Sequence, residues 1–514
     1  MVLRLAAEWC ETVKNNKWIY RPSPFMVPGT GRGPSPKRRI VEGLSAHPYI
    51  TILIIWTLVY VPILIAVGLS FPEDRTTTEL TIDDLRSSGE NKLEYFDPDI
   101  NVMLTARIIG NDTDVTVLAP DGFIPIRMEL VGYGKLYTSS PYDENRTWTL
   151  GDGEIRYIQQ KGNNVSWRVD VYKKVTDAPF YKDRGETLLE GHMIYRDVPT
   201  LNPPLINVFW IIPAMLGGSF FVFRSYFALF ALFSALLVMR TYWEEGRWKC
   251  VLFGGMFLLN PLTIYSTIGA VQDDIIVAFL FAVSVHSIIR RREFLASLTV
   301  GLGMATKVFH ALMLPGILSD RQPLARRLLR TILSVIVLAV VMIPVTYLSP
   351  GGVSTFARLY LTGDSGAELT GISLWRYLGE LGYPPFLNTP VLVLLGLGLL
   401  FVTFRKELGM IGTTLLFILL FLMVFPKIHS GYYLLLLPFI PFLWKMGASR
   451  FLIPLMGALV LLLDLMNGAS WNSGHLLFVP ILVCSVLYII TGYLFIRVLG
   501  ERLKDARINR RSRI

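Results

Sequence analysis

Apolar runs of about 20 residues, separated by short basic loops, constrain the fold of this chain more than any other feature. They recur between residues 47 and 497. A helix needs about 20 apolar residues to cross a hydrocarbon core, so the runs indicate a multi-span α-helical membrane protein. The composition agrees, because charged residues make up 17% of the chain, against about 25% in a soluble domain.

We expect about twelve spans. They are placed at 47–70, 221–240, 250–268, 274–289, 294–305, 307–319, 328–348, 388–404, 408–425, 430–446, 450–467 and 475–497. Lys and Arg gather in the loops on one side, for example at 290–292 and 405–406, and such loops face the cytoplasm. The net charge of +10 is therefore an orientation signal rather than a nucleic-acid surface. We predict a multi-pass protein of the plasma membrane, or of an equivalent internal membrane, with both termini cytoplasmic.

The chain divides into regions of different composition. We expect a basic cytoplasmic arm (1–46), a first span (47–70), an external β-rich domain (71–175), an outer catalytic loop with interfacial helices (176–220), a transmembrane bundle (221–498) and a basic cytoplasmic tail (499–514). Alternating segments such as 101–108 and 165–171 predict strands of a β-sandwich-like domain. The three cysteines lie outside this domain, so no disulfide framework is expected there. Its role, as a binding module or as a spacer, stays open.

Four groups of polar residues fall on the predicted outer side, close to the membrane. The first is the stretch 177–210, which contains three aspartates, Asp177, Asp183 and Asp197. The other groups are Gln272-Asp273-Asp274, Thr306-Lys307 and Lys427-Ile428-His429. Ionisable groups at membrane depth are costly and usually functional. We interpret the set as a site for an anionic, lipid-linked substrate.

Several short motifs carry a family resemblance. The segment 188–210 reads LLEGHMIYRDVPTLNPPLINVFW and resembles the first-loop motif of the GT-C superfamily of integral-membrane glycosyltransferases, especially the protein O-mannosyltransferase and aminoarabinose-transferase types. Phe223-Arg224, Thr306-Lys307 with Leu314-Pro315, and the segment 427–438 resemble later motifs of the same proteins. The matches keep their order from about residue 177 to residue 440.

The resemblance implies a polyprenyl-phosphate-linked sugar donor and an acceptor that is a glycan, a lipid or a protein. It implies a catalytic carboxylate in the first outer loop, which maps by position to Asp177. The family's acidic pair is absent, because Ala178 follows, so Asp183 and Asp197 remain alternatives. Cations would bind the donor phosphate, and the candidates are Lys307, Lys427, His429, Arg196 and Arg224. Candidate substrate-binding tyrosines are Tyr181, Tyr195 and Tyr432.

Asp273 and Asp274 have two interpretations. An acid favours a helix N-terminus, and paired carboxylates also suit Mg²⁺ or Mn²⁺. We therefore expect one to cap the next helix and the other to bind a metal or the acceptor. Alternatively, Lys307 extends its ammonium group to the lipid head groups without binding a ligand, and Lys427 and His429 only anchor the chain at the membrane interface.

Two other functions compete with a transferase. A transporter or lipid flippase with an external β-domain would need paired broken helices and polar groups at the membrane midplane, whereas the expected spans are nearly free of charge. A sensor or scaffold would bind through the β-rich domain. Within the superfamily, an oligosaccharyltransferase is disfavoured because the Trp-Trp-Asp signature is absent. The expected partners are the lipid-linked donor, its acceptor and membrane lipid, but no nucleic acid.

Overall fold

The structure is a computed structural model, and it describes most of the membrane part of the chain. The described residues are 43–70, the strands within 75–173, and 178–191, 202–348, 371–384, 387–447, 451–468 and 478–511. For the strands only the backbone is described. The expected basic arm lies almost wholly outside these residues.

Five helices are long and apolar enough to cross a membrane. They are α3 (Pro48–Ser70), α7 (Phe220–Thr241), α13 (Leu324–Leu348), α16 (Asn388–Lys406) and α20 (Phe478–Arg511). A sixth candidate consists of α8 (Arg247–Leu258) together with α9 (Pro261–Ile264) and the π-helix η2 (Tyr265–Gly269), which bend by 52° at the break. The chain is therefore an integral membrane protein with several spans.

The expected number of about twelve spans is corrected to five or six among the described residues. Most of the other expected spans are apolar helices of 10–17 residues. At about 1.5 Å per residue they reach only about 15–26 Å, which is less than the roughly 30 Å of hydrocarbon. These helices are α10 (Asp274–Ile289), α11 (Glu293–Thr306), α17 (Met410–Val424) and α19 (Leu452–Gly468). The equally short α6 (Pro204–Met215) lies in the outer loop, where interfacial helices rather than a span are expected.

Besides the broken segment of α8, α9 and η2, two expected spans are not continuous α-helices. The segment expected at 307–319 is a 3₁₀-helix, η3 (Val308–Met313), followed by α12 (Leu314–Leu318). The segment expected at 430–446 is a 3₁₀-helix, η6 (Ser430–Phe439), followed by α18 (Ile440–Lys445). Hydropathy detects the burial of both segments but not their backbone conformation, because an apolar 3₁₀-helix and an apolar α-helix have the same composition.

The short helices end at charged residues, and this places those residues together. α10 begins at Asp274, and α11 returns antiparallel to it and ends at Thr306, directly before Lys307. α17 ends at Val424, three residues before Lys427. The start of α10, the end of α11 and the end of α17 therefore define one end of the bundle, which holds the candidate site.

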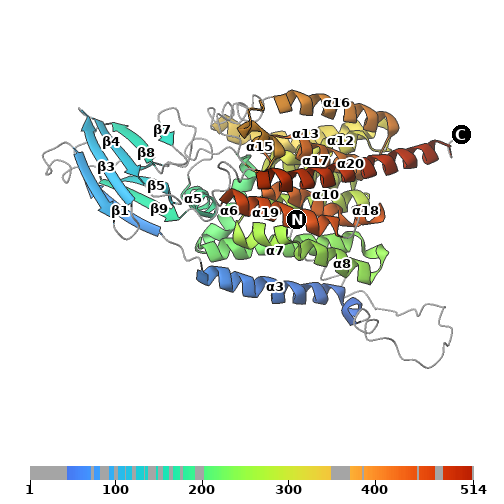
Figure 1. Cartoon of the computed structure of the whole chain (residues 1–514), viewed down its shortest axis with the longest axis horizontal. Helices are drawn as coiled ribbons and strands as arrows, with labels where there is room; N and C mark the ends of the chain where they lie inside the picture. Colours follow the sequence, from blue (N-terminus) through green and yellow to red (C-terminus); the bar gives the residue numbers. More distant parts are fainter. Residues whose placement is uncertain are drawn as a thin grey trace. The chain divides into compact units, whose positions relative to one another are not determined.

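Helix α10 forms the centre of this bundle. It is buried from Asp274 to Val285 apart from a partly exposed Phe279, and it packs against α7, α11 and η6. Figure 1 shows α3, in blue, running beside α7 and α8, in green, and these contacts are direct. A helix that is apolar on all sides belongs inside a membrane bundle, and α10 has this pattern.

Nine strands lie within 75–173 and form two antiparallel sheets. The first sheet has the order β1-β9-β5-β6 and the second the order β2-β3-β4-β8-β7. The strands are β1 (Arg75–Thr81), β2 (Lys92–Asp97), β3 (Val102–Ile109), β4 (Asp112–Leu118), β5 (Phe123–Val131), β6 (Gly134–Leu136), β7 (Arg146–Trp148), β8 (Glu154–Gln160) and β9 (Ser166–Lys173). The packing of the two sheets as a sandwich, and their external location, stay predictions.

Three short helices complete the description. They are α5 (Ala178–Leu189), the 3₁₀-turn η1 (Trp243–Glu245) and α15 (Leu374–Glu380). α5 packs against α6 and α7.

Candidate functional site

A buried ion cluster lies at the end of the bundle where α10 begins. Lys307 Nζ is 2.8 Å from Asp273 Oδ1 and 2.5 Å from Asp274 Oδ1. The side chains of the two acids are 6% and 7% exposed, and that of the lysine is 13% exposed. A buried carboxylate needs a partner, and one ammonium here serves two of them. The three charged groups sum to one negative charge.

The start of η6 closes this cluster from a third direction. Lys307 Nζ lies 5.8 Å above the centre of the Tyr432 ring, a cation–π arrangement. At Gly431 a Cβ atom would overlap Asp274 Oδ2 and would lie 2.8 Å from Asp274 Cβ. Only glycine therefore allows η6 to approach the carboxylate this closely. Sequence reasoning did not single out Gly431, although it sits between the motif residues His429 and Tyr432.

The central stretch of the sequence reaches the same cluster through Tyr181. The Asp273 backbone N–H donates to Tyr181 Oη at 3.4 Å. The Tyr181 ring stacks on Trp210 of α6, with centroids 4.7 Å apart, and it contacts Phe223 and Phe227 of α7. Helix α5 is thus anchored against α6 and α7, and a candidate substrate-binding tyrosine lies beside the acids.

A small residue permits this anchoring. A Cβ at Gly185 would lie 2.6 Å from Trp210 O and 2.8 Å from Ala214 Cβ, so glycine sets the close contact between α5 and α6. The Arg184 guanidinium lies 5.3 Å from the centre of the Trp210 ring. The polar first-loop region and the apolar segment after it therefore pack as one unit, although hydropathy separates them.

The loop 425–429 carries the second pair of candidate cations. The His429 ring lies 5.4 Å from the Tyr432 ring. Burial, assisted by the positive charges of Lys427 and Lys307, lowers the pKa of His429 to about 4. Burial also lowers the pKa of the Lys427 ammonium. Within the described part of the chain neither side chain has a hydrogen-bond or ion-pair partner, so both retain donors for an anion.

The segment 371–388 supports this loop through its backbone. Ile372 N–H donates to Ile428 O at 2.7 Å, and the Ser373 hydroxyl donates to Pro426 O. Two more donors satisfy carbonyls at the end of α17, because Trp375 Nε1 donates to Met423 O at 2.7 Å and Asn388 Nδ2 donates to Val424 O at 2.8 Å. The last carbonyls of a helix have no partner within it. These four bonds supply partners and fix the course of the chain that leads to Lys427 and His429.

Arg224, a predicted phosphate ligand, is deeply buried in α7. It is 1% exposed, and its Nε donates to Ile268 O at 3.1 Å. Ile268 belongs to η2, the π-helical turn that leads to Asp273. Its observed contact thus ties α7 to the chain that positions the acids.

Further polar residues around the cluster were missed as site residues. Ser430 Oγ donates to Gln272 Oε1 at 3.4 Å, which joins η6 to the loop before α10. Asp464 of α19 lies within hydrogen-bonding reach of Tyr265 and Ser430. An aspartate inside an apolar helix is an available signal for Asp464, but no sequence spacing connects it to residue 265 or 430.

The structure brings together one part of the predicted site. Tyr181, Asp273, Asp274, Lys307, His429 and Tyr432 form a chain of direct contacts, and Lys427 lies in the same loop as His429. Asp177, Tyr195, Arg196 and Asp197 lie outside the described residues, and for Asp183 only its place in α5 is described. The choice among the three candidate bases stays a prediction.

The predicted metal ligands Asp273 and Asp274 already share an ammonium group. Lys307 Nζ occupies the position between the two carboxylates that a bridging cation would take. Among the described residues no group of three or more His, Cys, Asp or Glu side chains surrounds a common point. The donor set does not fit a divalent ion unless Lys307 moves away, so metal binding here stays a prediction.

A comparison with protein families bears on this arrangement. Residues 201–426 match the model of glycosyltransferase family 87. The matched segment is similar to glycosyltransferases of this family. It includes Arg224, Asp273, Asp274 and Lys307, and it ends one residue before Lys427. The match supports, over this segment, the resemblance to membrane glycosyltransferases that the sequence motifs indicate.

Solved structures and curated proteins were also compared. The structure is similar to ArnT from Cupriavidus metallidurans in the apo state, with 15% sequence identity, a TM-score of 0.38, and coverage of 64% of this chain and 72% of that chain. ArnT bound to undecaprenyl phosphate gives 15% identity, a TM-score of 0.37, and coverage of 63% and 72%. No curated protein matches the chain.

Proposed function

We propose that this chain is a glycosyltransferase of the family 87 type that transfers a sugar from a polyprenyl-phosphate-linked donor to an acceptor, in a site at the outer face of the membrane. The observation that carries the proposal is the position of two partly buried basic side chains, Lys427 and His429, which have no partner among the described residues and lie near the acidic cluster of Asp273 and Asp274. A lipid-linked sugar phosphate presents an anion next to a reactive carbon, and the site offers cations next to carboxylates.

Lys427 and His429 are the groups best placed to hold the donor phosphate. Lys307 is already shared by two carboxylates, so a phosphate would have to compete with both of them. Lys427 and His429 have no such competitor among the described side chains. A phosphate placed between them would favour the protonated form of His429 and would form charge-assisted hydrogen bonds with both residues.

The reaction follows from this placement. The acceptor oxygen forms a bond to the anomeric carbon, and the bond from that carbon to the phosphate oxygen breaks. The electron pair remains on the departing polyprenyl phosphate, where Lys427 and His429 stabilise the charge. The acceptor proton passes to a carboxylate of the first outer loop. Asp177, Asp183 and Asp197 are the candidates for this base.

The phosphate role is tested by binding of polyprenyl phosphate to purified protein in lipid nanodiscs. Lys427→Gln and His429→Gln should each weaken binding by at least about tenfold, because one charge-assisted contact contributes about 1.5–3 kcal/mol. Lys249→Gln is the matched control. It removes a lysine that is half exposed and whose ion pair among the described residues is with Glu245, four positions earlier in the sequence. Equal affinity of all three variants for polyprenyl phosphate would contradict the proposal.

The base is tested separately, by transfer from a lipid-linked sugar extract to acceptor in membranes. Asp177→Asn, Asp183→Asn and Asp197→Asn are compared. One of them should lower transfer by about 10²–10⁴-fold and leave polyprenyl-phosphate binding unchanged. Normal transfer by all three variants would exclude a first-loop base while leaving the phosphate site intact.

A further inference from the structure

A polar cavity lies at the end of α10 that is opposite to the candidate site. It is lined at the ends of α10 and α11 by Ser287, Arg291 and Glu293, and beside α13 by Asp320, Gln322 and Arg330. α10 has 16 residues between its site end and this end, a length of about 24 Å at about 1.5 Å per residue. The cavity is therefore separate from the cluster around Lys307.

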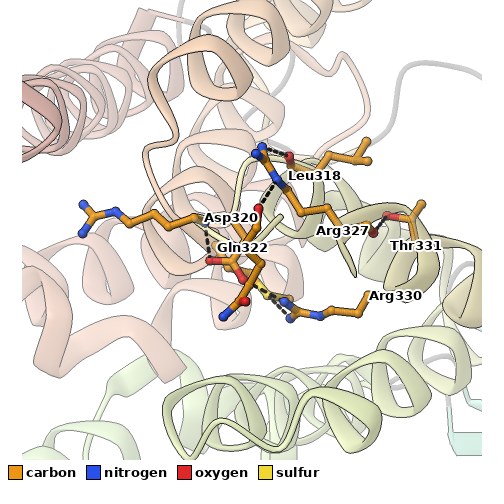
Figure 2. A network of polar contacts seen from close by, with 8 residues as sticks. Leu318, Asp320, Gln322, Arg327, Arg330 and Thr331 are labelled. Atoms are coloured by element: carbon orange, nitrogen blue, oxygen red, sulfur yellow. Dashed lines mark hydrogen bonds and ion pairs between the residues drawn. The ribbon is translucent and has the colours of Figure 1, made fainter. Parts of the chain in front are cut away.

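The inner wall of the cavity is held by a fixed ion pair. Arg330 is 6% exposed, its Nη1 donates to Asp320 Oδ2 at 2.7 Å, and its Nη2 lies 3.1 Å from Met410 Sδ. Figure 2 shows Arg330 extending from α13 toward Asp320 along these contacts. Its Nε has no hydrogen-bond partner in the described part of the chain. A buried, partly satisfied guanidinium is an anchor for an acceptor oxygen.

Neighbouring contacts make this wall rigid. Arg327 donates to Gln322 O at 2.7 Å and to Leu318 O at 3.1 Å, as Figure 2 shows, and it pairs with Glu407 at 2.9 Å. The Arg321 N–H donates to Asp320 Oδ1 at 2.8 Å. The segment 318–322 is thus tied to α13 from both sides, and the Asp320 carboxylate is held in one orientation.

The opposite wall of the cavity carries one cation, Arg291, and one anion, Glu293, that are not paired with each other. Arg291 has a φ of +56°, and this left-handed turn ends α10 through bonds from Arg291 N–H to Ile288 O and from Arg292 N–H to Ser287 O. The fixed turn sets Arg291 at the cavity wall, two residues before Glu293. Neither side chain has an ion-pair partner among the described residues.

These charges define the ligand that the cavity would accept. The guanidinium groups of Arg291 and Arg330 and the carboxylates of Asp320 and Glu293 line the cavity. Arg330 and Asp320 already pair with each other. The remaining pair, Arg291 and Glu293, complements a molecule with one negative and one positive group. The volume of about 310 Å³ holds a small polar group, and the cavity lies where apolar helices meet basic loops. This location favours a membrane lipid as the source of the ligand.

We propose that this cavity binds the phosphate–ethanolamine head group of a phospholipid, with the phosphate against Arg291 and Arg330 and the primary ammonium against Glu293. A choline head group has no N–H donor for Glu293. A glycerol head group gives a net negative lipid and leaves Glu293 unpaired. The cavity therefore selects an ethanolamine lipid over choline and glycerol lipids.

The test is retention of lipid by the purified full-length protein, measured by native mass spectrometry after exposure to phosphatidylethanolamine, phosphatidylcholine or phosphatidylglycerol. Wild type should retain one ethanolamine lipid at least tenfold more than either of the others. Arg291→Gln and Glu293→Gln should each reduce this retention at least tenfold. Arg292→Gln is the matched control, because it removes the same charge from the adjacent residue outside the cavity and should leave retention unchanged.

Three results would overturn the proposal. Equal retention of phosphatidylglycerol would show attraction to a basic surface rather than recognition of a zwitterion. An Arg292→Gln variant that behaves like Arg291→Gln would show the same. Displacement of the lipid by equimolar soluble phosphoethanolamine would assign the cavity to a soluble ligand. Melting temperatures of the variants, measured alongside, should match wild type because the substituted side chains have no ion-pair partner in the part of the chain that the structure describes.

Discussion

Lys307 directly follows α11 and Asp274 begins α10, and their charged atoms lie 2.5 Å apart inside the membrane part of the protein. The same ammonium group is 2.8 Å from Asp273. This contact joins the start of α10 to the end of α11, and the ammonium group also lies over the Tyr432 ring, which contacts His429. Removal of any one of these three charges should therefore lower the free energy of unfolding of the protein.

Lys307→Met should strongly destabilise the fold. It leaves two buried carboxylates without a counter-charge, and breaking a buried pair in this way costs about 3–5 kcal/mol. The measurement is the free energy of unfolding in detergent micelles. Lys249→Met, which breaks a half-exposed pair at 3.5 Å, should cost less than about 1 kcal/mol. A loss no greater than that of the control would show that the cluster does not stabilise the bundle.

Gly431→Ala should separate η6 from α10. The added methyl group would overlap the Asp274 carboxylate, and such overpacking costs about 1–3 kcal/mol. Transfer activity should fall with stability, because Tyr432 and the loop before it move with η6. Gly396→Ala in α16 is the control, since nothing lies within 4 Å of its Cβ position, and alanine there should be neutral or stabilising by up to about 1 kcal/mol.

Tyr181→Phe should cost about 0.5–1.5 kcal/mol of unfolding free energy, because the Asp273 N–H loses its acceptor while the stacking on Trp210 remains. Tyr226→Phe is a matched change on α7. The Tyr226 hydroxyl is buried without a hydrogen-bond partner in the described part of the chain, so its removal should be neutral or stabilising. Thermal unfolding of both variants checks this. Equal losses of unfolding free energy would show that the contact between the Tyr181 hydroxyl and the Asp273 N–H does not stabilise the protein.

The stability contribution of His429 should depend on pH. Its pKa in the folded state is about 4, below the ordinary value of 6.5, so the unfolded chain takes up the proton first as the pH falls. The contribution is complete above about pH 6.5 and is lost as the pH falls toward about 4, by up to about 3 kcal/mol. His429→Gln should lack this slope when unfolding free energy is measured between pH 4 and 8. Parallel curves for variant and wild type would contradict the buried, neutral histidine.

Metal binding at Asp273 and Asp274 can be tested through Lys307. If the ammonium occupies the cation position, Lys307→Met should bind Mn²⁺ at least about tenfold more tightly than wild type, because a like charge within 3 Å of the site is removed. Electron paramagnetic resonance of bound Mn²⁺ gives the affinities. Tight stoichiometric binding by wild type would instead support the original metal prediction.

Much of the candidate site could be predicted because charged residues are rare within the apolar part of a membrane protein and are therefore easy to identify in its sequence. Asp273, Asp274, Lys307 and His429 stand out as ionisable residues between apolar runs, and the structure links them by direct contacts. Their pairing could not be predicted. The sequence predicts that the lysine binds phosphate, that one acid caps α10 and that the other binds a metal or the acceptor. It does not predict that these side chains contact one another across 33 and 34 residues of sequence. Gly431 was missed because the need for glycine arises only from the approach of η6 to α10.

The sequence by itself determined that the chain is a membrane protein, where its apolar segments begin and end, and that it resembles GT-C enzymes, because hydropathy and short motifs are local properties. Only the tertiary structure decided how many of those segments are long helices, which backbone the others adopt, and which charges meet. The physical reason is that a 3₁₀-helix and an α-helix of the same apolar residues look alike in sequence, and that the partner of a buried charge is chosen by packing. Lys307 finds its two carboxylates only when α10 and α11 lie side by side.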